Sequence, residues 1–200
     1  MIRVGMRLTE FLRHFVDAAA AADRRYVQTQ DAADVAAGIA VWEQLASVEL
    51  LGGAGPELVV DAYLSVSMLY ARRYEAQGHD DDLALALHYL DEARRHVVAG
   101  SFADLQVRMS TAAWLMVRFQ AHGRREDLDE AIAGWSRLLE SDAGALAAAN
   151  LGRALLVRHD LTGDAADRRE GRRLLGMASV EMPSDHPALA DVRHALRAAG

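Results

Sequence analysis

Residues 123–139 read GRREDLDEAIAGWSRLL, and their apolar positions predict one face of a helix. Counted from Leu128, the apolar residues recur at i, i+3, i+4, i+7, i+10 and i+11, which is the spacing of an amphipathic helix. Alanine, leucine, arginine and glutamate dominate the rest of the chain, and only 3 prolines occur. These residues favour helices over strands. We therefore expect an all-α fold.

The same apolar pattern occurs four times along the chain, each time after an aspartate. The aligned aspartates are Asp34, Asp82, Asp127 and Asp167. They are 48, 45 and 40 residues apart, a length that holds two helices and two short connections. A tryptophan also recurs at one register, as Trp42 and Trp135. The sequence therefore predicts four helical hairpins, each with a first and a second helix.

Small residues mark a fixed point on the first helices. Ser67, Ala112 and Gly152 each stand eleven residues before a glycine that ends the first helix. Small side chains at one position allow the neighbouring helix to approach closely. We expect helices at about 5–24, 32–50, 56–77, 81–99, 103–122, 126–141, 143–160, 164–179 and 187–199.

The predicted architecture is a right-handed α-solenoid of about four hairpins in a single domain over residues 1–200. The hairpins are expected at about 5–50, 56–99, 103–141 and 143–179. The helix at 187–199 is expected to cap the array. The fourth copy carries Arg168 and Arg172 at two apolar positions, which fits a polar end of the array.

The stretches 123–132 and 150–158, followed by Thr162-Gly163-Asp164, resemble tetratricopeptide (TPR) repeats. More narrowly, they are similar to the long-period repeats of actinobacterial multidomain proteins, which accompany CHAT-type peptidase domains or regulatory NTPases. The resemblance implies a bacterial protein-binding scaffold. The period here exceeds the usual 34 residues of a TPR unit. HEAT-like repeats match the period better and stay as an alternative fold, but the turn of glycine and acidic residues favours the TPR class.

Composition disfavours several classes of function. The net charge of −7 provides no basic surface for nucleic acid. The chain contains no cysteine, and all 22 of its basic residues are arginine, which excludes thiolate and lysine chemistry and indicates a GC-rich bacterial genome. No apolar run is long enough for a transmembrane helix, and residues 1–7 lack a signal-peptide core. We expect a cytoplasmic protein that does not contact membranes.

The turn at 78–83 reads GHDDDL and is rich in acidic residues. It occupies the same register as the other three hairpin turns, and only its last aspartate, Asp82, recurs in all of them. An aspartate there is expected to cap the second helix by accepting backbone N–H groups. His79 has no counterpart in the other copies, so we prefer a solvated cap to a metal site.

A second candidate for metal binding lies downstream. His88, Glu92 and His96 follow i, i+4, i+8 spacing, so we expect them to share one face of the helix at 81–99. This set supports an alternative function as a helical metal-dependent hydrolase. The competing interpretation is a polar helix face, because Asp91 and Arg95 are also spaced for a helical ion pair and no HExxH motif occurs.

Other catalytic signals are weak. No Gly-x-Ser-x-Gly motif occurs, and Ser101 is expected to cap a helix. The glycines at 52–55 lack the following Lys-Ser/Thr of a phosphate-binding loop. We therefore predict no catalytic residues, no metal and no cofactor.

Stacked hairpins present their first helices on a concave groove that suits a peptide or a helix of a partner. The resemblance to TPR proteins then implies which residues face or border this groove: Asp61, Leu64, Met68, Gln106, Arg108, Met109, Ala113, Ala149, Asn150, Arg153 and Leu156. The expected function is a non-catalytic protein-interaction module, whose partner the family suggests to be a CHAT-type or regulatory protein. Self-association into a homo-oligomer is a further possibility.

Overall fold

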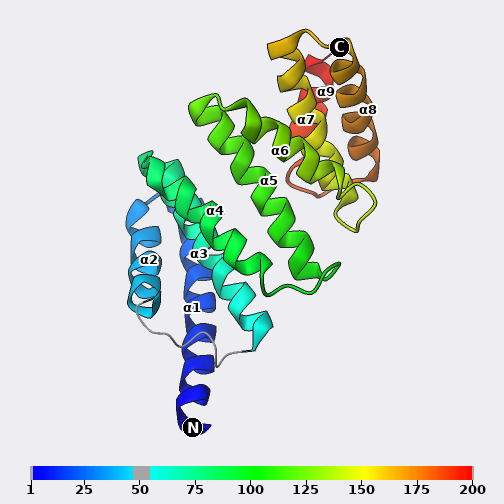
Figure 1. Cartoon of the computed structure of the whole chain (residues 1–200). Helices are drawn as coiled ribbons and strands as arrows, with labels where there is room; N and C mark the ends of the chain where they lie inside the picture. Colours follow the sequence, from blue (N-terminus) through cyan, green and yellow to red (C-terminus); the bar gives the residue numbers. More distant parts are fainter. Residues whose placement is uncertain (1, 47–54, 200) are drawn as a thin grey trace. The chain divides into compact units, whose positions relative to one another are not determined.

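The computed structural model describes residues 2–46 and 55–199, and these contain nine α-helices and no strand (Figure 1). The all-α prediction is confirmed. Side chains are described for residues 9–43 and 55–199. The predicted helix end at 47–50 and most of the glycine loop at 52–55 lie outside the described residues. The helices are α1 (Ile2–Thr29), α2 (Ala32–Ala46), α3 (Pro56–Gln77), α4 (Asp80–Arg94), α5 (Phe102–His122), α6 (Arg125–Ser136), α7 (Gly144–Thr162), α8 (Ala165–Glu181) and α9 (Leu189–Ala198).

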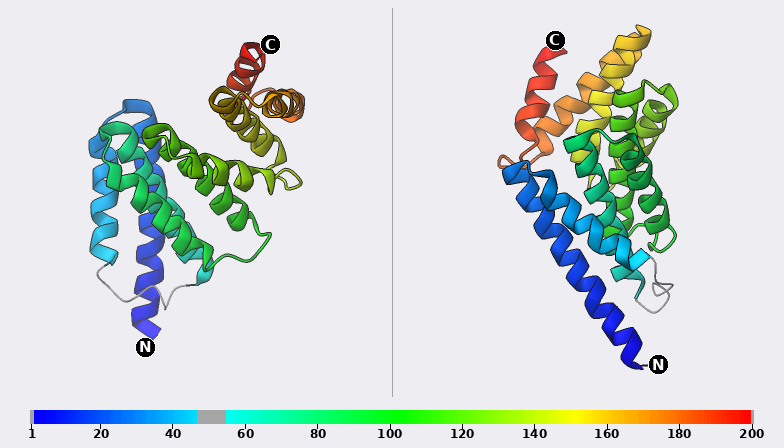
Figure 2. Two further views of the ribbon diagram at one scale, coloured as in Figure 1. Left: turned by 45° about the horizontal axis from the view of Figure 1, so that its top comes forward. Right: turned by 90° about the vertical axis from the view of Figure 1, so that its left-hand side faces the viewer.

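The chain forms two compact units, the first of which is Met1–Val107. Within it, α3 packs against α1, α2 and α4, and α1 also packs against α2 (Figures 1 and 2). The two hairpins of this unit are joined by an ion pair in which Nε of Arg72 on α3 donates to Asp23 on α1 at 2.7 Å. The central position of α3 follows from its buried residues, which include Val59, Val66 and Leu69.

The second unit is Arg108–Gly200. Its α7 packs against α6 and α8, and α9 packs against α8. Arg168 and Arg172 on α8 both donate to the carbonyl oxygen of Ala199, at 3.3 and 3.2 Å. These two arginines replace apolar residues of the repeat, and each holds the carboxyl-terminal end of α9 against α8.

The predicted close approach at the small residues is confirmed. A Cβ atom on Gly152 would lie 2.9 Å from the carbonyl oxygen of Gly171, so α7 and α8 meet backbone to backbone. In the second hairpin, the Ser67 hydroxyl donates to the carbonyl of Ala86 on α4 at 2.9 Å. Larger side chains at these points would push the two helices apart.

Each first helix ends at a residue with left-handed backbone conformation, whose N–H donates to a carbonyl oxygen four residues earlier. Glycine adopts this conformation without steric cost, whereas other residues do not. Only the first turn uses another residue, Gln30, with φ of 57°. The other turn residues are Gly78, Gly123 and Gly163, with φ of 70°, 69° and 75°.

Three predicted helix ends are wrong. α4 ends at Arg94 instead of 99, and α6 ends at Ser136 instead of 141. After both helices the backbone bonds shorten to three-residue turns, such as Leu138 N–H to the Trp135 carbonyl at 3.0 Å. Leu138 is buried in the turn after α6, and its apolar character explains why the sequence predicts a longer helix. α1 reaches Thr29 instead of 24, because the buried Tyr26 extends its apolar stripe.

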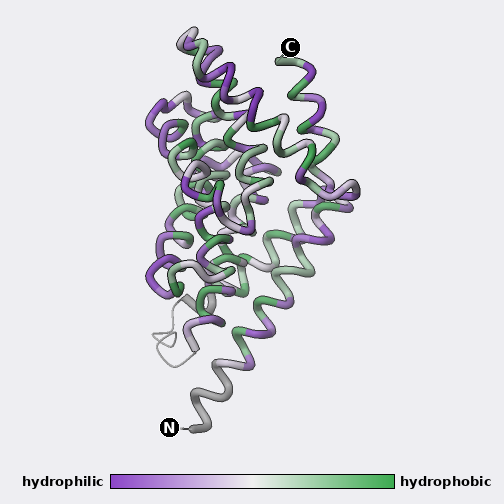
Figure 3. Tube along the Cα trace, turned by 90° about the vertical axis from the view of Figure 1, so that its right-hand side faces the viewer, coloured by the Kyte–Doolittle hydropathy of each residue, from purple (hydrophilic) through white to green (hydrophobic). Residues whose placement is uncertain are grey.

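Apolar and polar residues alternate along the helices at the period of a helical turn (Figure 3). At one register of the repeat the apolar side chain is buried in all four copies, as Trp42, Leu90, Trp135 and Leu175. The capping prediction for Ser101 is also confirmed, because its hydroxyl accepts the Asp104 N–H at 3.2 Å. The sequence pattern therefore identified the core-facing side of the second helices correctly.

Candidate functional site

Every hairpin turn is closed by an ion pair between an arginine of the first helix and the recurring aspartate of the second helix. In the last three copies, both carboxylate oxygens accept hydrogen bonds from one guanidinium, a strong and geometrically specific arrangement. In the third hairpin these bonds measure 2.8 and 2.6 Å. The four pairs are Arg25–Asp34, Arg73–Asp82, Arg118–Asp127 and Arg158–Asp167.

Three of these aspartates, Asp82, Asp127 and Asp167, are among the few buried charged residues in the described part of the chain. The side chains of Asp82 and Asp127 are 1% and 2% exposed. Hydrogen bonds from Arg118 and Arg158 hold the pKa of Asp127 and Asp167 below its ordinary value, although burial acts in the opposite direction. Asp127 and Asp167 are therefore ionised structural groups, each neutralised by its own arginine.

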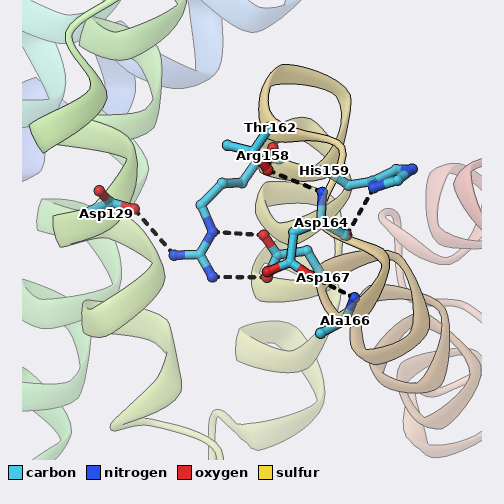
Figure 4. A network of polar contacts seen from close by, with 7 residues as sticks. All are labelled: Asp129, Arg158, His159, Thr162, Asp164, Ala166 and Asp167. Carbon is cyan, nitrogen blue, oxygen red and sulfur yellow. Dashed lines mark hydrogen bonds and ion pairs between the residues drawn. The ribbon is translucent and has the colours of Figure 1, made fainter.

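The fourth turn shows how the ion pair is supported (Figure 4). Nη1 of Arg158 also donates to Asp129 on α6 at 3.1 Å, which links the third and fourth hairpins. The Thr162 hydroxyl donates to the carbonyl of Arg158 and accepts the N–H of Asp164. The Asp164 carboxylate in turn accepts the N–H of Ala166 at 2.8 Å, which caps α8. The polar side chains described at this turn thus bond to other groups of the fold.

The prediction that the recurring aspartates cap the second helices is wrong. Asp82 and Asp127 are the third residues of α4 and α6, and their carboxylates accept hydrogen bonds from arginines. The N-cap residues are His79 and Arg124, whose side chains make no capping bond. The arginine partners could have been found in the sequence, because one stands nine residues before each aspartate.

The predicted groove residues all lie on first helices, and all except Ala149 are at least half-exposed. Ala149 on α7 is 0% exposed, so its prediction as a groove residue is wrong. Asp61, Leu64 and Met68 lie on α3, and Asn150, Arg153 and Leu156 lie on α7; these are half-exposed except for Asp61, which is exposed. On α5, Gln106 falls in the first unit, whereas Arg108 and Met109 fall in the second. Gln106 and Arg108 are exposed, and Met109 is half-exposed.

The α3 residues form one continuous strip. Asp61, Leu64 and Met68 follow Glu57 at i+4, i+7 and i+11, so the four side chains share a face of the helix. Glu57 and Asp61 are exposed, and neither forms an ion pair among the described residues. Partial burial, and secondarily the charge of Glu57, raise the pKa of Asp61 above its ordinary value. We call Glu57, Asp61, Leu64 and Met68 the α3 strip.

The α7 residues are partly used within the fold. Nη2 of Arg153 donates to Oδ1 of Asn150 at 2.8 Å, which fixes both side chains on one turn of the helix. Leu156 lies against α8, since its Cγ atom would be 3.1 Å from a Cβ placed on Gly171. Arg153 forms no ion pair within the described residues, and its charge stays available to a carboxylate.

An aromatic cluster in the first unit was not found from the sequence beyond its tryptophan. Trp42 meets Tyr63 and Tyr89 edge to face, with ring centroids 5.8 and 5.4 Å apart, and Tyr89 stacks on Tyr70 at 5.7 Å. Burial, with Tyr89 and Glu43 nearby, raises the pKa of Tyr70 to about 12. Trp42 is 1% exposed, in keeping with its place on the apolar stripe of the second helix. The cluster unites α2, α3 and α4 into one core.

The proposed metal ligands His88, Glu92 and His96 do not share a helical face. α4 ends two residues before His96, whose ring stacks on Tyr63 at 6.1 Å. Glu92 forms an ion pair with Arg95 at 2.7 Å. Within residues 2–46 and 55–199, no group of three or more His, Asp or Glu is arranged to hold a metal ion. The hydrolase alternative therefore lacks the geometry on which it was based.

No helix in the described part of the chain is long and apolar enough to cross a membrane. Comparisons with known proteins yield no matching family, no similar curated protein and no similar solved structure.

Proposed function

We propose that residues 1–200 form a single right-handed TPR-like solenoid that acts as a non-catalytic protein-interaction module. In this proposal, a peptide or helix of a partner protein binds along the first helices. The observation that carries it is the fourfold repetition of one hairpin, with the same arginine–aspartate closure and the same left-handed turn. Successive hairpins of this kind stack side by side and expose their first helices along one surface.

The distribution of side chains supports binding on the first helices. The recurring aspartate of each turn already forms an ion pair with an arginine within the fold. By contrast, Leu64, Met68 and Met109 are apolar and half-exposed on first helices. Half-exposed leucine and methionine side chains suit the apolar stripe of a partner helix. The TPR resemblance adds a cytoplasmic, actinobacterial setting and a CHAT-type or regulatory partner to the proposal, and a homo-oligomer is the alternative assembly.

Site-specific photo-crosslinking tests the proposal. A photoreactive phenylalanine derivative is placed at Met68 on α3 and, as a control, at the exposed Ala84 on α4, the second helix of the same hairpin. Irradiation in lysate of the source organism is expected to join one predominant protein to the Met68 variant and not to the Ala84 variant. Identical products from both variants, or no protein product from Met68, would overturn the proposal.

A further inference from the structure

The charge of the chain is concentrated in its first unit. Residues 1–107 contain 9 arginines and 16 acidic residues, a net charge of −7, whereas residues 108–200 contain 13 of each. Residues 26–71 contain 6 acidic residues and no basic residue. This interval includes the α3 strip. The first unit therefore carries the whole net charge of the chain, and cations are attracted to it.

Glu57 and Asp61 of the α3 strip form no ion pair among residues 9–43 and 55–199, whose side chains the structure describes. Other aspartates of the same unit are paired, Asp23 with Arg72 and Asp82 with Arg73. Glu57 stands in the first turn of α3, where the helix dipole stabilises a negative charge. Asp61 is the sixth residue of α3, beyond the reach of that effect. Its carboxylate is partly desolvated and close to the like charge of Glu57, and it has no counterion among the described side chains.

An uncompensated carboxylate beside apolar side chains has a simple chemical complement. Leu64 and Met68 lie on the same face of α3 as Asp61, one and two turns further along the helix. A ligand that lies along α3 would therefore contact carboxylates at the amino-terminal end of the strip and apolar side chains beyond them. A helix with arginine or lysine beside a leucine-rich stripe matches both parts. A guanidinium or ammonium placed at Asp61 would also lower its raised pKa toward the ordinary value.

We propose that the α3 strip binds a basic amphipathic helix of a partner protein. This inference rests on the proposed function and adds the chemical class of the partner. The arginines or lysines of the partner pair with Glu57 and Asp61, and its apolar stripe covers Leu64 and Met68. α8 of a second copy is a poorer occupant, because three of its four arginines already bind the Ala199 carbonyl or Glu170.

Two synthetic peptides test the charge preference by fluorescence polarisation on the full chain. Both have 18 residues and leucines at i, i+3, i+4 and i+7 spacing; one carries arginines at the flanking positions and the other glutamates. At low salt, the arginine peptide is expected to bind at least about tenfold more tightly than the glutamate peptide. Removing both charges of the strip, in E57Q/D61N, is expected to weaken binding of the arginine peptide about five- to tenfold.

The matched control is D80N/D81N, which removes two negative charges from the first turn of α4 in the same unit. It is expected to change binding of the arginine peptide less than about twofold, apart from the general charge effect at low salt. Equal losses in the two double variants, or equal affinities for the two peptides, would overturn the inference. If Met68 crosslinks a partner but neither peptide binds, the interaction module stands and the basic-helix inference fails. Light scattering that shows dimers lost in E57Q/D61N would overturn it in favour of a second copy.

Discussion

Replacing Arg118 with methionine removes the cation that neutralises Asp127 while keeping an unbranched apolar stem. The Asp127 side chain is 2% exposed and accepts two short hydrogen bonds from Arg118. Breaking a buried ion pair from one side costs about 3–5 kcal/mol, because the remaining charge stays desolvated. Arg118 is 24% exposed, so water partly replaces the guanidinium, and we expect a loss of about 3 kcal/mol in the free energy of unfolding.

Arg124 provides a matched control, because it approaches the same carboxylate at 3.8 Å from an exposed position. Arg124→Met is expected to cost less than about 0.5 kcal/mol. Urea unfolding followed by far-UV circular dichroism measures both variants. The double variant R118M/D127N is expected to be more stable than R118M, since it removes the unpaired charge. Equal stability of R118M and R124M would refute the reasoning.

The pH dependence gives a second test of the same ion pair. The pKa of Asp127 is lowered in the folded state, so its contribution to stability is present above the unfolded pKa of about 3.9 and is lost as the pH falls through the folded value. The stability difference between wild type and R118M should therefore be constant near pH 7 and shrink below about pH 4. A difference that persists unchanged in acid would contradict the assignment.

Three further predictions concern backbone and metal. Gly152→Ala is expected to cost about 1–3 kcal/mol, because its Cβ would press on Gly171, whereas Gly176→Ala, with nothing within 4 Å, should be neutral or stabilising; urea unfolding distinguishes them. Gln30→Gly should stabilise the chain by about 1 kcal/mol in the same assay, by relieving the positive φ, and a loss of stability would contradict this. Addition of zinc should shift the thermal unfolding midpoint of neither wild type nor H88A. A rise in the midpoint confined to wild type would restore the metal alternative.

The sequence predicted the elements that depend on local patterns. The register of the four aspartates, the apolar stripe behind each and the small residues at Ser67 and Gly152 all reflect helical periodicity or close packing, which short spacings reveal. The solenoid and the partner surface depend on how hairpins associate, and they remain proposals. The α3 strip was found in part, since Asp61, Leu64 and Met68 were predicted and Glu57 was not.

The errors have physical causes. An acidic residue at a helix start commonly caps the helix, so the local pattern predicts a cap at each aspartate. The arginine nine residues earlier binds the carboxylate instead. The predicted α6 is too long because Leu138 is buried in the turn that follows the helix. The apolar spacing therefore continues past the last helical hydrogen bonds. The stacking of Tyr70 on Tyr89 is a contact between helices that no local spacing indicates.

The turn carboxylates are each paired with an arginine, whereas the Asp61 carboxylate on α3 has no cation among the described side chains. Carboxyl-carbon NMR across an acid titration tests both halves in one series of spectra. We expect Asp34, Asp127 and Asp167 to titrate below the ordinary aspartate pKa and Asp61 to titrate above it. Titration of Asp61 together with the turn aspartates, or an ordinary pKa for Asp127, would contradict the account.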